Sequence, residues 1–210
     1  FGISARARDL LRVHHAAELQ ALVEQPQLYP KGWLALGGGS NIVITGDVQP
    51  LVIKLEIMGK QLVEETDKHW IVQAGAGENW HQFVAWTLAQ GWLGLENLAF
   101  IPGVVGSAPV QNIGAYGLEV QDRFHSLDAV DMETGRTFTL DAAQCGFGYR
   151  DSVFKHKPTR AGDYGLGGKA IITHVRFALP KKWRAEIGYL DLERKMAEQG
   201  ITNPTAQQVF

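Results

Sequence analysis

The sequence predicts an α+β protein made of two α/β units, residues 1–57 and 58–202, followed by the start of a third segment at residues 203–210. Two observations support this prediction. Short apolar or alternating strand patterns and amphipathic helical stripes recur in both units. The chain also has 210 residues, of which 45% are hydrophobic and 20% charged, as is usual for one or two globular domains.

The first unit shows the elements of a small α/β fold. A helical stripe spans residues 19–23 and ends before a proline. Residues 33–36 are expected to form a buried strand, residues 37–41 a tight glycine loop, and residues 42–44 a resumption of the strand. Apolar residues alternate with charged ones over residues 53–57, which predicts a half-buried strand.

The second unit is expected to contain two hairpins, a helix and a late strand. The first hairpin covers residues 61–74, and the second turns at residues 133–135. Between them, apolar residues at helical spacing follow the candidate cap Asn79 and end before Gly91. Alternation over residues 171–177 predicts the late strand.

The C-terminal residues carry two helix signals. Residues 190–198 are expected to form a helix that Gly200 stops. Asn203 and Pro204 then resemble an N-cap followed by proline at the first helical position. Because the sequence stops at Phe210, we expect a further domain to begin here and to be cut short.

Composition argues against several classes of protein. A net charge of −2 argues against general binding to nucleic acid or to an anionic membrane surface. The single cysteine excludes an intrachain disulfide and fits a reducing compartment. The seven histidines show no metal-ligand spacing, so no metal site is expected.

An uncharged stretch is the most unusual feature of the chain. Of residues 79–118 only Glu96 is charged, and residues 101–117 combine four glycines with two prolines. Prolines, glycines and amides interrupt this stretch too often for a membrane span. Irregular backbone that is buried needs partners for its N–H and C=O groups. The stretch is therefore either a main-chain bed for a large polar cofactor or a tightly packed crossing between domains.

Two other segments are candidate ligand sites. The consecutive amides of residues 37–41 are suited to a phosphate, although an ordinary turn between strands explains them as well. This loop lacks the lysine of a P-loop, and no glycine motif in the chain matches the Rossmann fingerprint. In residues 147–157, Arg150 beside Tyr149 suits a carboxylate or an oxyanion, and the alternative is a surface turn in which Arg150 pairs with Asp151.

Four segments taken together resemble a known family. They are LGGGSN (residues 36–41), GAGENWHQFV (75–84), GLENLAFIPGVVGSAPVQNIGAYG (94–117) and FGYRDSVFKHK (147–157). In this order and spacing they are similar to bacterial UDP-N-acetylenolpyruvoylglucosamine reductases (MurB), and the similarity covers nearly the whole chain. The resemblance implies the fold of vanillyl-alcohol-oxidase/PCMH-type flavoproteins, with FAD between two α/β subdomains.

 The same resemblance implies a cytoplasmic enzyme that acts as a monomer.

The resemblance also implies the reaction and its site. The family uses NADPH to reduce the enolpyruvyl ether of UDP-N-acetylglucosamine to UDP-N-acetylmuramate during peptidoglycan precursor synthesis, passing hydride through one flavin. Arg150 matches the catalytic arginine that holds the enolpyruvyl carboxylate, and Tyr116, Tyr149 and Tyr189 match positions that face the substrate. The residues that would meet FAD are Gly37, Gly38, Gly39, Ser40 and Asn41 at the pyrophosphate, and Pro102, Gly103, Gly106, Ser107, Val110, Ile113 and Gly117 along the flavin.

The sequence departs from the family pattern in one respect. The proton-donating serine and a catalytic glutamate of the family lie in a third, C-terminal domain, and neither motif occurs in these 210 residues. The resemblance therefore implies an FAD site and Arg150 without a full catalytic set. Two alternatives remain open: another flavoprotein oxidase or dehydrogenase of the same fold, and a non-catalytic fragment that only binds FAD.

Overall fold

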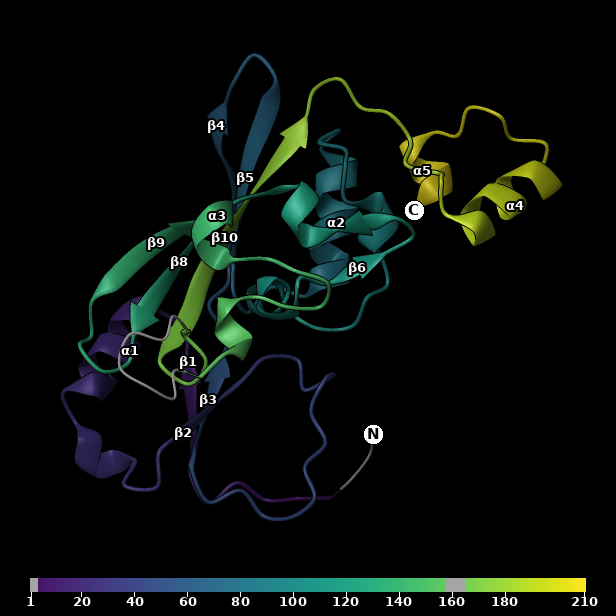
Figure 1. Cartoon of the computed structure of the whole chain (residues 1–210). Helices are drawn as coiled ribbons and strands as arrows, with labels where there is room; N and C mark the ends of the chain where they lie inside the picture. The colour runs from purple at the N-terminus through teal and green to yellow at the C-terminus, as the bar shows by residue number, and fades with distance from the viewer. Residues whose placement is uncertain (1–3, 158–164) are drawn as a thin grey trace.

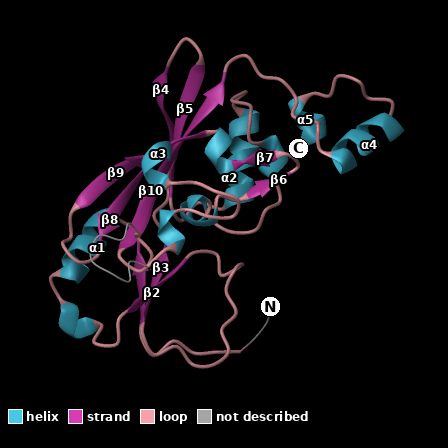
Figure 2. Ribbon diagram, viewed as in Figure 1, coloured by secondary structure: helices cyan, strands magenta, loops and turns pink. Residues whose placement is uncertain are grey.

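The fold consists of two larger β-sheets, a short two-stranded pair and the helices that flank them (Figure 1). It was obtained as a computed structural model, which describes residues 4–157 and 165–210. A three-stranded sheet comes from the first 55 residues, and a five-stranded sheet comes from residues 60–180. Figure 2 shows β3 near one end of β10, and Ile53 of β3 shares a hydrophobic cluster with Ile171 of β10.

The three-stranded sheet is parallel and has the order β1-β3-β2. Its strands are β1 (Leu10–Val13), β2 (Trp33–Leu36) and β3 (Leu51–Leu55), and helix α1 (Ala16–Val23) follows β1. The alternating pattern of residues 53–57 predicted a half-buried strand. The strand is present as β3, but it ends at Leu55 and is buried except for Lys54, because it lies at the centre of the sheet. Leu19 and Leu22 of α1 are buried against this sheet, which confirms the predicted helical stripe.

Two other expectations, for residues 33–44, are wrong. Residues 33–36 form the predicted strand, but β2 is only half-buried because it is an edge strand beside a cavity. Residues 42–44 do not form a strand, and Val43 is 58% exposed. They belong to a long connection between β2 and β3 in which no neighbouring strand pairs with their backbone.

The five-stranded sheet is antiparallel and has the order β4-β5-β10-β8-β9. Its strands, in chain order, are β4 (Lys60–Glu65), β5 (His69–Gly75), β8 (Phe124–Asp131), β9 (Thr137–Asp141) and β10 (Ala170–Pro180). Both predicted hairpins and the predicted late strand are therefore confirmed. The long strand β10 occupies the centre, where alternating residues such as Val175 and Phe177 are buried.

A shared hydrophobic core joins the two sheets. Val13, Leu19 and Ile53 from the first 55 residues pack in one cluster with Val130 and Ile171 from the five-stranded sheet. A second cluster surrounds Trp80, Phe83 and Phe177, whose rings are 5.3 to 6.1 Å apart between centroids. Because the sheets share side-chain contacts, the division at residue 57 marks a change of sheet rather than a gap in the core.

Helix α2 (Trp80–Ala89) begins and ends where the sequence predicts. Asn79 caps it, since its Oδ1 accepts a hydrogen bond from the amide of Gln82 at 3.0 Å. Gly91 follows the helix with a φ of +78°, a conformation that favours glycine at a helix C-terminus. The helix turns Trp80 inward, where its Nε1 donates to the carbonyl of Leu98 at 2.7 Å.

Short elements cover the segment between α2 and β8 and the one after β9. They are η2 (Glu96–Leu98), η3 (Val105–Ser107), η4 (Pro109–Gln111), β6 (Gly114–Ala115), β7 (Leu118–Glu119), η5 (Val120–Asp122), α3 (Ala142–Cys145) and η6 (Val153–Lys155), with η1 (Pro26–Leu28) earlier in the chain. After α2, the uncharged stretch is thus a series of single turns followed by a hairpin of two two-residue strands. Such irregular backbone can follow the outline of a cavity.

Two helices form the C-terminal part, which lies beyond α2 in Figure 1. Helix α4 (Leu190–Glu198) has the predicted bounds, and Gly200 follows it with a φ of +69°. Helix α5 (Ala206–Val209) starts later than expected. Its cap is Thr205, whose Oγ1 accepts a hydrogen bond from the amide of Gln208 at 3.3 Å, rather than Asn203.

Two kinds of feature are absent from the described residues. None of the helices there is long and apolar enough to cross a membrane. No group of three or more histidine, cysteine, aspartate or glutamate side chains in residues 4–157 and 165–210 is arranged to hold a metal ion.

Candidate cofactor site

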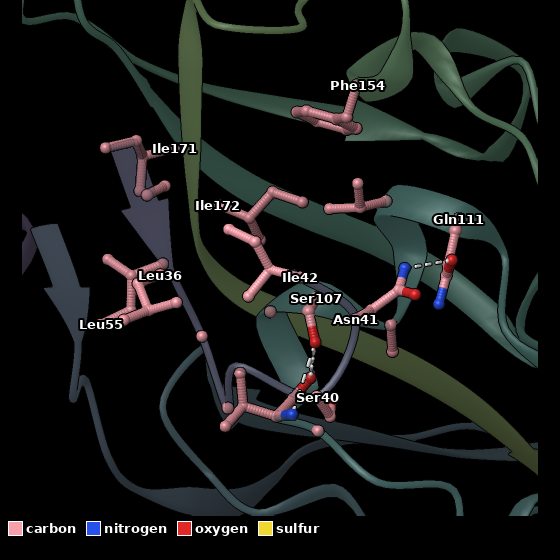
Figure 3. A pocket seen from close by; sticks show the side chains of 18 of the residues that line it. Leu36, Ser40, Asn41, Ile42, Leu55, Ser107, Gln111, Phe154, Ile171 and Ile172 are labelled. Carbon is pink, nitrogen blue, oxygen red and sulfur yellow. Dashed lines mark hydrogen bonds between the residues drawn. The ribbon is translucent and has the colours of Figure 1, made fainter. Parts of the chain in front are cut away.

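A cavity of about 450 Å³ lies between the two sheets. Three segments form its walls: β2 with the following loop to residue 42, residues 102–113, and residues 154–172 as far as the structure describes them. Figure 3 shows side chains from these segments facing a common space, with Leu36 and Ile172 among them. A volume of this size is typical of small-molecule and cofactor sites.

Side chains anchor the loop of residues 37–41 by hydrogen bonds at both of its ends. At its start, the Nζ of Lys54 donates a hydrogen bond to the carbonyl of Gly37. At its end, Ser40 Oγ donates to the carbonyl of Pro102 at 3.1 Å. Asn41 Nδ2 donates to Gln111 Oε1 at 2.8 Å (Figure 3). These bonds tie the loop to the opposite wall while its glycines keep their main chain uncovered.

The wall of residues 102–113 packs directly on the sheet. Gly106 donates its amide to the carbonyl of Ala76 at 3.0 Å, and Val105 donates to the carbonyl of Glu78 at 2.8 Å. Ser107 Oγ closes the turn by donating to the carbonyl of Val104 at 2.8 Å. Part of the buried backbone in the uncharged stretch is therefore satisfied by other main-chain groups.

The site fits a dinucleotide cofactor in shape and chemistry. The loop of residues 37–41 approaches residues 102–113 so closely that a Cβ on Gly38 would lie 3.1 Å from Gly103 Cα. A side chain at this position would therefore occupy the space between the two segments. Glycine amides are good partners for phosphate oxygens. Trp33, Leu36 and Phe154 give the cavity apolar walls suited to planar rings.

Most of the residues expected at FAD line this one cavity. Eleven of the twelve do so: Gly37, Gly38, Gly39, Ser40, Asn41, Pro102, Gly103, Gly106, Ser107, Val110 and Ile113. Gly117 is not among the lining residues and lies instead near Tyr189. The structure thus brings together two segments that are 60 residues apart in the sequence.

Arg150 lies outside the cavity lining but beside its wall. Its guanidinium donates to the carbonyls of Asn112 at 3.3 Å and Gly114 at 2.5 Å, and Asn112 stands between two lining residues. Lys155, which lines the cavity, donates from Nζ to the carbonyl of Arg150 at 3.0 Å. The Arg150 side chain is 39% exposed, so it can reach a ligand at the cavity edge.

Residues 148–151 do form a turn, in which Gly148 and Asp151 exchange two backbone hydrogen bonds, but Arg150 and Asp151 do not pair in it. Asp151 Oδ2 instead lies 2.8 Å from His156 Nε2, and this contact is the main reason that the pKa of Asp151 lies below its usual value. The carboxylate that faces Arg150 belongs to Glu119, at 3.5 Å. Arg150 therefore points toward the uncharged stretch rather than along its own turn.

The three candidate substrate tyrosines are all exposed. Tyr149 stacks on the Arg150 guanidinium, with 5.1 Å between Cζ and the ring centroid. Tyr116 and Tyr189 meet edge to face at 5.7 Å between centroids. Asn97 joins the segments that carry this pair, because its Nδ2 donates to the carbonyls of Tyr116 at 3.0 Å and Glu186 at 2.7 Å.

Several residues of the site escaped sequence reasoning. Lys157, Gln111 and Trp33 line the cavity, and Asn112 and Glu119 hold Arg150. A weak signal existed for Glu119, since it is the first charged residue after the uncharged stretch. Nothing in the sequence pattern distinguishes Trp33 from a core residue of a buried strand.

The fold and this cavity define a protein that holds an extended organic cofactor between two sheets. The sequence model described as FAD binding domain matches residues 8–141. The chain therefore belongs to the FAD binding domain family.

Relatives of known name point in the same direction. UDP-N-acetylenolpyruvoylglucosamine reductase of Burkholderia orbicola (strain MC0-3) is 52% identical over 206 residues, which are 98% of this chain and 57% of that protein. The enzyme of the same name from Azoarcus sp. (strain BH72) is 48% identical over 213 residues, covering 100% of this chain and 59% of the relative. The chain thus spans less than two thirds of the length of these curated relatives.

Solved structures agree on the fold. The MurB reductase of Thermus caldophilus matches with a TM-score of 0.64 at 28% identity, over 90% of this chain and 60% of that one. Glucooligosaccharide oxidase of Acremonium strictum matches with a TM-score of 0.54 at 13% identity, over 83% of this chain and 36% of that one. A p-cresol methylhydroxylase also matches with a TM-score of 0.54 at 13% identity, over 82% of this chain and 35% of that one. The fold is therefore of the vanillyl-alcohol-oxidase/PCMH type.

Proposed function

We propose that this chain is the FAD-binding part of an NADPH-dependent reductase that converts UDP-N-acetylglucosamine enolpyruvate to UDP-N-acetylmuramate. The observation that carries the proposal is the 48% to 52% identity, over almost the whole chain, to enzymes named for that reduction. The reaction would serve peptidoglycan synthesis in the cytoplasm, and through cell-wall biogenesis it would support cell shape and cell division. The protein would act as a monomer.

The cavity would hold FAD along its length. Residues 37–41 would bind the pyrophosphate through main-chain amides, and residues 102–113 would lie along the flavin ring system. Lys155 and Lys157 would add positive charge near the phosphates, since both line the cavity. The bound flavin would supply hydride transfer between NADPH and the enolpyruvyl substrate.

Arg150 would hold the carboxylate of the substrate. A guanidinium is always charged and makes two parallel hydrogen bonds to a carboxylate. Fixed positive charge there also stabilises the negative charge that develops on the carbon beside the carboxylate. Tyr116, Tyr149 and Tyr189 are exposed side chains from three segments near Arg150 or Gly117, and we assign them to the remainder of the substrate.

The proton donor of the reaction is expected outside these residues. The family resemblance assigns that step to a serine of a C-terminal domain, with a glutamate beside it. We therefore expect this chain to bind FAD and to accept hydride without completing the reduction. Turnover of the enolpyruvyl substrate by the 210 residues alone would contradict that expectation.

The test is a visible absorption spectrum followed by anaerobic reduction. The purified chain, reconstituted with FAD, should show a flavin band, and adding NADPH without oxygen should bleach it. A flavin band that NADPH leaves intact, with reduction by an alcohol or a sugar and reoxidation by oxygen, would favour an oxidase of the same fold. A band that no donor bleaches would favour a fragment that only binds FAD.

A further inference from the structure

Arg150 is held by a polar network that the proposed function leaves without a role. The network comprises Asn112 and Glu119, which both accept hydrogen bonds from the guanidinium, and Gln121, which donates to Glu119. Asn112 is fully buried, and the Glu119 side chain is 24% exposed. Buried polar groups of this kind fix the positions of the side chains that they contact.

Glu119 accepts hydrogen bonds on both carboxylate oxygens. Its Oε2 accepts from Asn112 Nδ2 at 2.9 Å and from Gln121 Nε2 at 2.8 Å. Its Oε1 accepts from Arg150 Nη1 at 3.5 Å. All three neighbours are donors, so this position requires a side chain with two acceptor oxygens and no donor.

Asn112 connects this network to the segment around Gln121 and to the turn of residues 148–151. It adopts a left-handed conformation with a φ of +43°, and its Oδ1 accepts from the amide of Gln121 at 3.0 Å. Its Nδ2 also donates to the carbonyl of Gly148 at 2.9 Å, and its own carbonyl accepts from Arg150. Arg150 itself has a φ of +55°. Strained backbone at two contacting residues is typical of a functional site.

The bonds leave one edge of the guanidinium free. Nη1 has two acceptors, Asn112 O and Glu119 Oε1, and Nη2 has one, Gly114 O. Among the residues that the structure describes, Nε and the second Nη2 proton have no acceptor. The Nε–Nη2 edge is one of the two edges at which arginine makes paired hydrogen bonds to a carboxylate.

We infer that Glu119, supported by Asn112, is a positioning residue that fixes the Nη1 side of Arg150 and so presents its Nε–Nη2 edge to a ligand carboxylate. This inference rests on the proposed function for the identity of the ligand. The geometry, in which Glu119 fixes the Nη1 side of Arg150, does not depend on the proposed function, and a measurement on Arg150 alone can test it.

The decisive variant is Glu119→Gln. A glutamine has one acceptor oxygen and one NH₂ group, so in either orientation its NH₂ faces a donor, from Arg150 or from Asn112 and Gln121. Glu119→Asp is the second variant, because it keeps the charge but withdraws the carboxylate from Nη1 by about one carbon–carbon bond, roughly 1.5 Å. Glu133→Gln is the matched control, since it removes an exposed carboxylate paired with Lys169 at 3.2 Å.

The measurement is NMR of the chain with isotope-labelled arginine, in which loss of signal in Arg150→Lys assigns the guanidinium of Arg150. The rate of rotation about its Cζ–Nε bond should rise at least tenfold in Glu119→Gln, about 1.4 kcal/mol in the barrier. It should also rise in Glu119→Asp and stay at the wild-type value in Glu133→Gln. A folded Glu119→Gln or Glu119→Asp variant whose rotation rate equals that of wild type would overturn the inference.

A binding measurement distinguishes this inference from the proposed function. The FAD-loaded chain is titrated with UDP-N-acetylglucosamine enolpyruvate and, as a probe without the carboxylate, with UDP-N-acetylglucosamine. Glu119→Gln should raise the Kd for the enolpyruvate about tenfold and change the Kd for UDP-N-acetylglucosamine by no more than about twofold. Equal binding of the enolpyruvate by wild type and Arg150→Lys would sink the proposed role of Arg150, while the rotation rates would still decide whether Glu119 fixes it.

Discussion

Replacing Gly106 by alanine tests whether the wall of the cavity depends on direct backbone packing. A Cβ at this position would lie 2.9 Å from Ala76 Cα and 3.1 Å from Ala76 O, and closer still to Ala76 Cβ. Ordinary carbon–carbon contacts are about 3.5–4.0 Å. The contact with Ala76 Cα alone requires the wall to move by roughly 0.6–1.1 Å, and the contact with Ala76 Cβ requires more, because Ala76 has no flexible side chain that could turn away.

The expected cost follows from this displacement. Overpacking a well-packed site costs about 1–3 kcal/mol, and a rigid neighbour places Gly106→Ala near the upper end. A shifted wall also weakens cofactor binding. We expect the Kd for FAD to rise at least tenfold. At an FAD concentration of 100 times the wild-type Kd, FAD should stabilise wild type by about 2.7 kcal/mol and the variant by about 1.4 kcal/mol.

The assay is urea unfolding of the chain with and without FAD. Gly46→Ala is the matched control, because nothing lies within 4 Å of a Cβ at that position and its φ is not in the left-handed region. The control should keep wild-type stability and the full gain from FAD. If Gly106→Ala unfolds at the same urea concentration as Gly46→Ala and gains as much from FAD, the packing reasoning is wrong.

Three further predictions concern single contacts. Asn41→Ala removes the bond to Gln111 across the cavity, so the Kd for FAD measured by flavin fluorescence should rise by about fivefold, roughly 1 kcal/mol; an unchanged Kd would mean that the bridge does not position the loop. Trp80→Phe leaves the buried carbonyl of Leu98 without its donor and should lower the free energy of unfolding, measured by urea melts, by about 1–3 kcal/mol. An unchanged free energy of unfolding would mean that this hydrogen bond does not stabilise the fold. Burial raises the pKa of Cys145 to about 12, so a thiol reagent at pH 8 should modify it only after unfolding, and fast labelling of the native chain would contradict its burial.

Local signals predicted the regular elements of the fold well. Helix α2 has both its cap Asn79 and its terminal Gly91 where the sequence indicates, because capping depends on neighbouring residues alone. The alternating pattern of β10 is read correctly for the same reason, since burial of one face requires period two.

The errors occur where the outcome depends on distant residues. Residues 42–44 have strand propensity, but no strand lies beside them to pair with. Residues 33–36 are only half-buried because all four line a cavity, although Trp33 also packs against the hydrophobic core. At the C-terminus, Asn203 and Thr205 are both good caps, and local sequence does not distinguish between them.

The site itself was predictable only in part. Charge depletion over residues 79–118 indicated a buried irregular segment, and the structure places residues 102–113 of it along the cavity. Neither the approach of residues 37–41 to this segment nor the network of Glu119 and Arg150 has a signature in spacing, because each joins segments that are at least 30 residues apart.

The most direct test is a crystal structure of the chain grown with FAD. Continuous density for one FAD should run along residues 37–41 and 102–107, with the phosphates within hydrogen-bond distance of the glycine amides. A cofactor bound elsewhere, or a cavity closed by side chains with FAD present in the crystal, would contradict the proposal that these two loops form the cofactor site.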